Sequence, residues 1–284
     1  NTSTYWYGLR SYYGEFDIAN ANSIIQRSTA ITYPYGIYAY YTNDPRYGNQ
    51  PTTGALFTNN EVNLYTTSTY YGAYFYYSTI NFYNNSILMR GTAAARGMYL
   101  GNVANSYYDI QGNNIVTLSS TGIPIYFSSA PTAAYYNFAS NNLYGPSYIA
   151  YAGGNVSGLA AWRGFFPNDV NTISVNPTYV DNTQSLQLTN YAPFATRRIP
   201  GVTRDINDSL RAFTTAMGCY KGFDPRGVDA ILNSISDLQS GAVVNQSDSV
   251  RVELLNGGNT TLTTATINWS INGVNQAPVT WTGS

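Results

Sequence analysis

Acidic and basic side chains, which most hydrolytic and eliminative chemistry requires, are scarce in the middle of this chain. Between Glu61 and Asp169 the only acid is Asp109. Glycoside hydrolysis needs two carboxyl groups about 5–9.5 Å apart, and a lyase needs a base beside a uronate. The bases of this stretch are Arg90, Arg96 and Arg163. Because arginine is almost always protonated, we expect no catalytic residue here.

The other candidates for chemistry are acids that lie late in the chain. They are Asp169, Asp181, Asp205, Asp208, Asp224, Asp229 and Asp237. Carboxylates can bind Ca²⁺, but the spacing matches no known calcium loop. We expect no metal and no cofactor, and a calcium site among these residues stays an open alternative.

Composition excludes several classes of function. Histidine is absent, charged residues make up 10% and the net charge is −1, so no basic face for nucleic acid is expected. No apolar run approaches the roughly 20 residues of a membrane span, so no membrane insertion is expected. Cys219 is the single cysteine and cannot form an internal disulfide. Without a histidine to activate it, we interpret it as a small buried hydrophobic residue.

Aromatic residues are the stronger candidates for binding, because 29 of the residues are tyrosines. In runs such as the one from Tyr74 to Tyr77, neighbouring rings point to opposite faces of a strand. Rings such as those of Tyr74 and Tyr76 could bind a sugar or another protein from an outer face. The alternative is that the tyrosines fill and shield the core. The pair Trp162 and Arg163, in a predicted side loop or short helix, resembles a ligand site most closely.

A loose internal repeat indicates the elements that position these side chains. Each copy has two apolar residues around one other residue, then an asparagine pair and then aliphatic residues. The copies cover residues 16–25, 56–60, 80–88, 108–116 and 136–143. From residue 56 onward their spacing is about 25–29 residues, which is typical of stacked coils. A second block, a glycine, an apolar residue and a tyrosine, follows at Gly36, Gly72 and Gly97.

This period predicts a right-handed parallel β-helix. It is too short for a βαβ unit of about 30 or more residues, and it suits a coil of three strands that each pair with the next coil. Asparagine tolerates left-handed backbone at a corner, and stacked asparagines can pass hydrogen bonds between coils. The asparagine pairs are therefore interpreted as structural turn residues.

The later motifs carry a resemblance to a known family. Residues 171–188 (NTISVNPTYVDNTQSLQL) and the segment from Val202 to Tyr220 resemble the closing motifs of pectate-lyase-like right-handed β-helix proteins. Asp208 stands where glycine is usual, and Lys221 where an acid is common. The resemblance covers roughly residues 15–224 and implies the fold more than an activity. It implies that Asp181, Asp205 and Arg211 tie down the last coil.

From about residue 225 the pattern changes to alternating strands. Residues 228–235, 249–255 and 265–271 are predicted strands, with turns at 256–258 and 272–273. The ending resembles the Ig-like modules of large secreted bacterial proteins of the type IX secretion class. Since a complete module needs about seven strands over about 100 residues, we expect an incomplete sandwich. Its open edge, with Trp269 and Trp281, is a predicted assembly site.

Two short motifs, Asp208-Ser209-Leu210 and Asp248-Ser249-Val250, match the O-glycosylation signal of that secretion class. Ser209 and Ser249 are therefore possible glycosylation sites. No signal peptide is visible, so a secreted, cell-surface location is inferred from the composition and the resemblance.

The sequence thus predicts an all-β protein, with a parallel β-helix at 1–224 and a partial Ig-like β-sandwich at 225–284. The preferred hypothesis is an extracellular structural or adhesive subunit of a fibre, stalk or sheath. Its predicted partners are other copies of itself or other surface proteins. The alternative is a protein that binds polysaccharide or cleaves it, in the latter case as a polysaccharide lyase.

Overall fold

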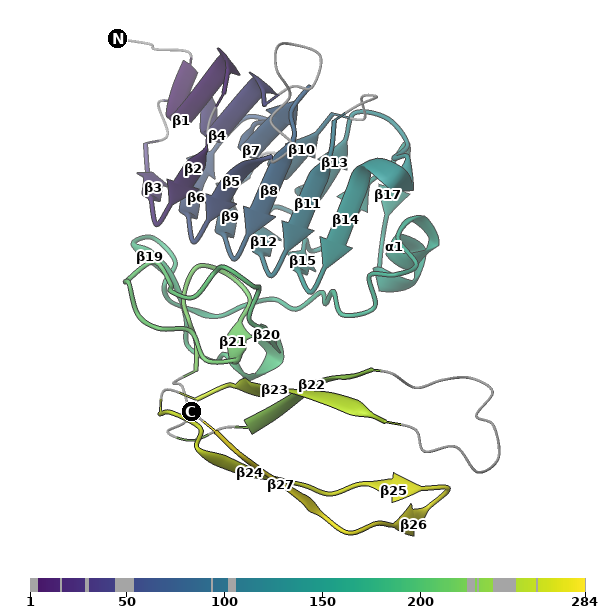
Figure 1. The fold of residues 1–284 in the computed structure, drawn as a ribbon. Coiled ribbons are helices and arrows are strands. Elements are labelled where there is room, and N and C mark those ends of the chain that lie inside the picture. Colours follow the sequence, from purple (N-terminus) through teal and green to yellow (C-terminus); the bar gives the residue numbers. More distant parts are fainter. Residues whose placement is uncertain are drawn as a thin grey trace. The chain divides into compact units, whose positions relative to one another are not determined.

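Three parallel sheets run through the N-terminal part of the chain in the computed structural model, and each coil adds one strand to each sheet (Figure 1). The structure describes residues 5–15, 17–28, 31–43, 54–92, 94–101, 106–223, 228, 230–236, 249–258 and 260–283. The chain divides into two compact units, residues 1–223 and 224–284. The first unit contains a β-solenoid of about five turns, so the predicted parallel β-helix architecture is confirmed.

The sheets are here called A, B and C. Sheet A contains β1 (Tyr5–Gly14), β4 (Tyr33–Thr42), β7 (Tyr71–Tyr76), β10 (Arg96–Leu100), β13 (Ile123–Phe127), β16 (Ala150–Tyr151) and the antiparallel β17 (Asn155–Val156). Sheet B contains β2 (Ile18–Asn20), β5 (Ala55–Thr58), β8 (Ile80–Tyr83), β11 (Tyr108–Gln111) and β14 (Tyr136–Ala139). Sheet C contains β3 (Ser23–Gln26), β6 (Glu61–Thr66), β9 (Ser86–Gly91), β12 (Asn114–Thr117) and β15 (Asn142–Tyr144). A 3₁₀ turn, η1 (Ala133–Tyr135), precedes β14.

An asparagine ladder joins the coils at the corner between sheets B and C. The Nδ2 of Asn85 donates to Oδ1 of Asn113 at 3.1 Å, and the Nδ2 of Asn113 donates to Oδ1 of Asn141 at 3.0 Å. The same two Oδ1 atoms also accept the backbone N–H of the ladder asparagine one coil earlier: Asn113 accepts from Asn85 at 2.8 Å, and Asn141 accepts from Asn113 at 3.0 Å. Each amide therefore has partners in the coils on both sides, and the predicted ladder is confirmed.

The repeating corner unit is one asparagine preceded by a left-handed residue, which corrects the predicted pair. The ladder asparagines are Asn22, Asn60, Asn85, Asn113 and Asn141. The residues before them all have φ between 51° and 66°; they are Ala21, Asn59, Asn84, Gly112 and Ser140. The ladder residue is therefore the second asparagine of the pairs at 59–60 and 84–85, but the first asparagine of the pairs at 113–114 and 141–142. Any residue that tolerates left-handed backbone can occupy the first position.

The glycine column of sheet A brings its backbone close to the side chains of sheet C. A Cβ on Gly72 would lie 2.4 Å from Cγ2 of Ile87 and 2.6 Å from the carbonyl oxygen of Gly97. The apolar residues that follow these glycines pair in register from Ile37 to Ile125. A side chain at these positions would clash, which explains why the block repeats glycine.

One end of the solenoid core is closed by α1 (Leu159–Phe165), the short helix that the sequence allowed. The indole of Trp162 packs on the rings of Phe138 and Phe166, with centroids 4.9 and 4.6 Å away. Its Nε1 donates to Oδ2 of the buried Asp169 at 2.8 Å.

A strap from later in the chain covers the outer face of sheet C. It contains β18 (Tyr179–Asp181) and β19 (Ser185–Leu188), which form an antiparallel pair. Leu186 packs with the outward residues Leu88 and Val116 in a buried cluster. The central strands of sheet C, β6, β9 and β12, are consequently buried on both faces. The short elements η2 (Ala192–Phe194), β20 (Ala195–Arg197) and β21 (Thr214–Ala216) follow.

The C-terminal unit consists of antiparallel pairs. Its strands are β22 (Ala230–Ser236), β23 (Arg251–Asn256), β24 (Thr264–Ile267), β25 (Ser270–Ile271), β26 (Val274–Asn275) and β27 (Val279–Thr282). They form the pairs β22–β23, β24–β27 and β25–β26. Asn272 and Gly273 have φ of 51° and 81°, as the predicted tight hairpin requires. The described part of this unit is all-β, but it does not clearly form an Ig-like sandwich.

Candidate functional site

The outward positions of sheet A form three columns of tyrosine and arginine. The central column starts at Arg10 and continues through Tyr38, Tyr74, Tyr99, Tyr126 and Tyr151. One flanking column holds Tyr7, Tyr35, Tyr71 and Arg96, and the other holds Tyr12, Tyr40 and Tyr76. These columns, which we call the tyrosine face, contain no carboxylate.

Within each column the rings stack from coil to coil. In the central column the ring centroids of Tyr38 and Tyr74 are 5.1 Å apart, and those of Tyr74 and Tyr99 are 4.6 Å apart. Their planes differ by only 6° and 8°, and the stack continues to Tyr151. The neighbouring column meets this one at steep angles, such as 86° between Tyr35 and Tyr74. The result is a herringbone of offset-stacked and edge-to-face rings.

This packing decides which part of each ring is available to a partner. A ring such as that of Tyr74 has the rings of Tyr38 and Tyr99 against its two faces. A sugar ring binds best to an open aromatic face. Within the stacks the tyrosine face instead offers ring edges and phenol groups. We therefore consider it poorly suited to face-on stacking of sugars.

The two arginines belong to the aromatic array. The Arg10 guanidinium lies 4.8 Å from the ring centroid of Tyr7, and that of Arg96 lies 4.6 Å from the centroid of Tyr126. Burial is the main cause that raises the pKa of Tyr38 to about 12, and it also raises that of Tyr74. At neutral pH these phenols are therefore neutral groups that can donate hydrogen bonds.

The outer face of sheet B carries polar residues together with Ile18 and Leu56, and its one carboxylate is already engaged. Asp109 accepts hydrogen bonds from Tyr83 Oη at 2.5 Å, Gln111 Nε2 at 2.7 Å and Asn137 Nδ2 at 2.9 Å. A second acid at a working distance is required for glycoside hydrolysis, and no other outward residue of the sheet B strands is an acid. The geometry does not assemble such a pair on this face.

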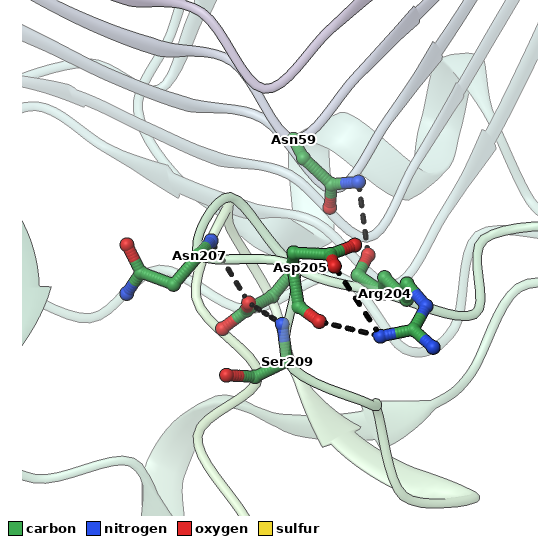
Figure 2. A network of polar contacts seen from close by, with 6 residues as sticks. Asn59, Arg204, Asp205, Asn207 and Ser209 are labelled. Atoms are coloured by element: carbon green, nitrogen blue, oxygen red, sulfur yellow. Dashed lines mark hydrogen bonds and ion pairs between the residues drawn. The ribbon is translucent and has the colours of Figure 1, made fainter.

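A groove of about 370 Å³ lies between sheet B and the closing segment at residues 200–208. Figure 2 shows its network, in which Asp205 accepts hydrogen bonds from the backbone N–H groups of Asn207 and Ser209 at 3.0 and 2.9 Å. Nδ2 of Asn59 donates to the carbonyl oxygen of Arg204 at 2.9 Å. Asp208 has φ of 59°, so it adopts the left-handed conformation that glycine favours.

Arg211 is hydrogen-bonded to an early coil and not to the last one, which corrects the expectation for this residue. The buried guanidinium of Arg211 donates to Oδ1 of Asn59 at 2.8 Å and to the carbonyl oxygen of Gly218 at 2.9 Å. Burial lowers its pKa to about 10. The backbone N–H of Cys219 donates to Oγ of Ser86 at 3.0 Å. Asp181 is different, because it is exposed and its Oδ1 accepts from Thr183 in its own turn.

The prediction of a ligand site at Trp162 and Arg163 is wrong for the tryptophan. Trp162 is fully buried because its indole closes the solenoid core. Arg163 is half-buried, and its Nη2 donates to the carbonyl oxygen of Val170 at 3.1 Å. The signal that the sequence analysis missed is the pairing of Trp162 with Asp169, seven residues later.

The other predicted sites lie apart from one another. Tyr74 and Tyr76 are both on the tyrosine face. Ser209 is half-buried in the groove network, and Ser249 is exposed in the C-terminal unit. In that unit Trp269 is exposed and its Nε1 donates to the carbonyl oxygen of Ala277 at 2.8 Å, whereas Trp281 pairs with Ala265 in the β24–β27 pair.

Among the described residues there is no cluster of three or more His, Cys, Asp or Glu side chains that could hold a metal ion. Within the same residues no helix is both long and apolar enough to cross a membrane. In comparisons with known proteins, no family model, no curated protein and no solved structure matches this chain. The functional proposal therefore depends on the chain's own geometry.

Proposed function

We propose that this chain is an extracellular structural or adhesive protein, and that copies of it associate through the tyrosine face. The observation that carries this proposal is the concentration of tyrosine and arginine, without acid or lysine, in the three outward columns of sheet A. Tyrosine and arginine are enriched in the centres of protein interfaces, whereas acids and lysine are depleted there. Stacking also holds the rings in place, so little side-chain entropy remains to be lost on binding.

A second copy suits this surface better than a stacked sugar. Ring edges and phenols from two herringbone arrays can interdigitate, burying apolar carbon while hydroxyl groups pair. Arg10 and Arg96 already lie over rings of their own chain. The same cation–π contact is available to rings of a partner.

Self-association is tested by sedimentation velocity over a range of protein concentrations. The wild-type chain is expected to associate, whereas Tyr74→Ser combined with Tyr99→Ser should be monomeric with an unchanged circular dichroism spectrum. Tyr107→Ser is the matched control, because Tyr107 is an exposed tyrosine outside the tyrosine face. A wild-type chain that stays monomeric, or a double variant that associates equally well, would contradict the proposal.

The C-terminal unit would supply a second contact, in line with an Ig-like module of the type IX secretion class. Support comes from its exposed apolar residues, which include Trp269 at 43% and Ile271 at 53%. Strand edges with free backbone groups favour pairing with another chain. Trp269→Ser should then shorten any assemblies seen by negative-stain microscopy while leaving the initial association intact.

The groove beside sheet B favours a second candidate function, glycan binding with or without lyase activity. It combines exposed apolar carbon of Ile18 with the polar groups of Thr58 and Arg204. The test is incubation with pectin, alginate and glycosaminoglycans, followed by measurement of unsaturated products, new reducing ends and retained ligand. Binding or cleavage that is lost in Arg204→Ala would support this function, and no retention of any glycan would reject it.

A further inference from the structure

Beside the tyrosine face, a separate column of tyrosines runs along the corner at which the β1, β4 and β7 strands end. Its members are Tyr13, Tyr41 and Tyr77, with φ of 52°, 53° and 51°. Left-handed backbone is uncommon for a bulky residue, yet it occurs three times in register here. The ring centroids are 4.6 Å apart in both steps, and the planes differ by 9° and 13°. We call this set the corner column.

Each ring of the corner column also meets the edge or face of a neighbouring ring. Tyr13 lies 4.6 Å from Tyr12, Tyr41 lies 4.5 Å from Tyr40, and Tyr77 lies 4.3 Å from Tyr76. The phenol groups of Tyr40 and Tyr41 are hydrogen-bonded, as are those of Tyr76 and Tyr77. Phenols in contact with other phenols are thus concentrated at one corner.

Solvent reaches one end of the corner column more easily than the middle of sheet A. Tyr13 is 56% exposed, whereas Tyr41 and Tyr77 are half-buried, as Tyr74 and Tyr99 are. A soluble oxidant can therefore reach Tyr13, whose ring stacks directly on that of Tyr41. The exposed ring of Tyr13 can also turn to form a new bond.

We propose that Tyr13, Tyr41 and Tyr77 form a site of oxidative phenol coupling, which joins successive coils through dityrosine when a peroxidase and hydrogen peroxide are present. Each of two phenols loses one electron and one proton and becomes a phenoxyl radical. The radicals form a carbon–carbon bond between ring positions ortho to oxygen, and the two displaced ring hydrogens return to the oxygens. The two electrons and two protons reduce one hydrogen peroxide to two waters.

The contacts favour coupling within a chain over coupling between chains. Rings that already touch have an effective concentration far above that of a second molecule in dilute solution. A link from Tyr13 to Tyr41, or from Tyr41 to Tyr77, closes a loop of about 30 residues, comparable to the loop of a stabilising disulfide. Cys219 is the single cysteine of the chain, so no internal disulfide can join these coils.

The test treats the dilute, full-length chain with horseradish peroxidase and hydrogen peroxide, then maps cross-linked peptides by mass spectrometry. The expected product migrates as a monomer, fluoresces as dityrosine and joins Tyr13 to Tyr41 or Tyr41 to Tyr77, with the loss of two hydrogens. Its Tm should rise by several degrees relative to untreated protein.

Tyr41→Phe removes the central phenol and keeps the ring stack, so the intrachain yield should fall by about tenfold or more. Tyr13→Phe is a second variant. It should abolish the Tyr13–Tyr41 link while the Tyr41–Tyr77 link still forms. Tyr107→Phe is the matched control and should change nothing, because Tyr107 is 42% exposed but has no ring contact among the described residues. Cross-links that are equally frequent at Tyr107, that join only separate chains, or that persist in Tyr41→Phe would overturn the proposal.

Discussion

Sheets A and C belong to the same coils, yet their outer faces are composed in opposite ways. The outward positions of sheet C include the aliphatic residues Leu88 and Val116, which the chain covers with Leu186 of its own strap. The outward positions of sheet A are mostly tyrosine and arginine, and Tyr12 and Tyr13 remain more than half exposed. A face that the chain closes itself can be aliphatic. A face that stays in contact with water needs residues that combine apolar area with a polar group.

The comparison also separates two ways of stabilising a solenoid. Sheet C gains hydrophobic burial from a segment about 100 residues away in sequence, and the Glu61 carboxylate of sheet C accepts a hydrogen bond from the backbone N–H of Leu186 in that segment. The outer face of sheet A is instead held by ring stacks between adjacent coils, and its glycines pack against side chains of sheet C. Substitutions on the two outer faces should therefore differ in cost, and three experiments measure this difference.

The largest effect is expected for Leu88→Ala beneath the strap. Leu88 is fully buried between sheet C and Leu186, so its truncation should lower the free energy of unfolding by about 2–5 kcal/mol. Urea unfolding followed by circular dichroism measures the change. The matched substitution Tyr126→Ala on sheet A should cost less than half as much, and equal costs would show that the strap adds no stability.

The next effect concerns Glu61, whose carboxylate accepts the backbone N–H of Leu186 in the strap. Burial raises the pKa of Glu61 above its ordinary value of 4.5, despite hydrogen bonds from the strap. The folded chain thus binds this proton more tightly than the unfolded chain does. The contribution of protonated Glu61 to the free energy of unfolding is therefore largest below pH 4.5, and it is lost as the pH rises through the pKa of the folded state.

Glu61→Gln should remove this pH dependence and should leave the Tm at neutral pH equal to or above that of the wild type. Thermal unfolding at several pH values checks the prediction, with exposed Glu15→Gln as the control. A steeper fall in Tm with rising pH in the variant would contradict it.

The smallest effect should appear on sheet A at alkaline pH. The pKa of Tyr38 is raised from 10.0 to about 12, chiefly by burial. Stability that depends on the neutral phenol is therefore present below pH 10 and lost as the pH rises toward 12. Tyr38→Phe should weaken this alkaline loss of stability, and Tyr135→Phe, outside sheet A, should not. Unfolding midpoints across this pH range provide the measurement.

Much of the solenoid could be predicted because its signals repeat once per coil. The glycine block and the asparagines were enough to predict the repeat period and a coil of three strands. The corner register was offset by one residue, because Asn59 and Asn84 satisfy the left-handed position as well as Gly112 does. A pattern of residue types could not distinguish the two roles of asparagine.

Contacts between distant segments were harder to predict. The strap could not be placed, since nothing local in the sequence connects Leu186 with Leu88. The aliphatic residues at outward positions of sheet C were a usable signal, because they imply a covered face. On sheet A the rings of Tyr74 and Tyr76 were identified, but the central column was not, although its tyrosines recur one coil apart. Trp162 was misplaced because its aromatic character fits an end cap as well as a binding site.

The asparagine ladder has a consequence for how this fold tolerates changes in length. Successive ladder residues are separated by 38, 25, 28 and 28 positions, yet the side-chain hydrogen bond is remade at every step. The ladder therefore acts as a fixed spine, and the remaining corners absorb insertions and deletions. A foreign peptide inserted between sheets A and B would then be displayed at a fixed position along the rod, which makes the solenoid a scaffold whose coils can be lengthened one at a time.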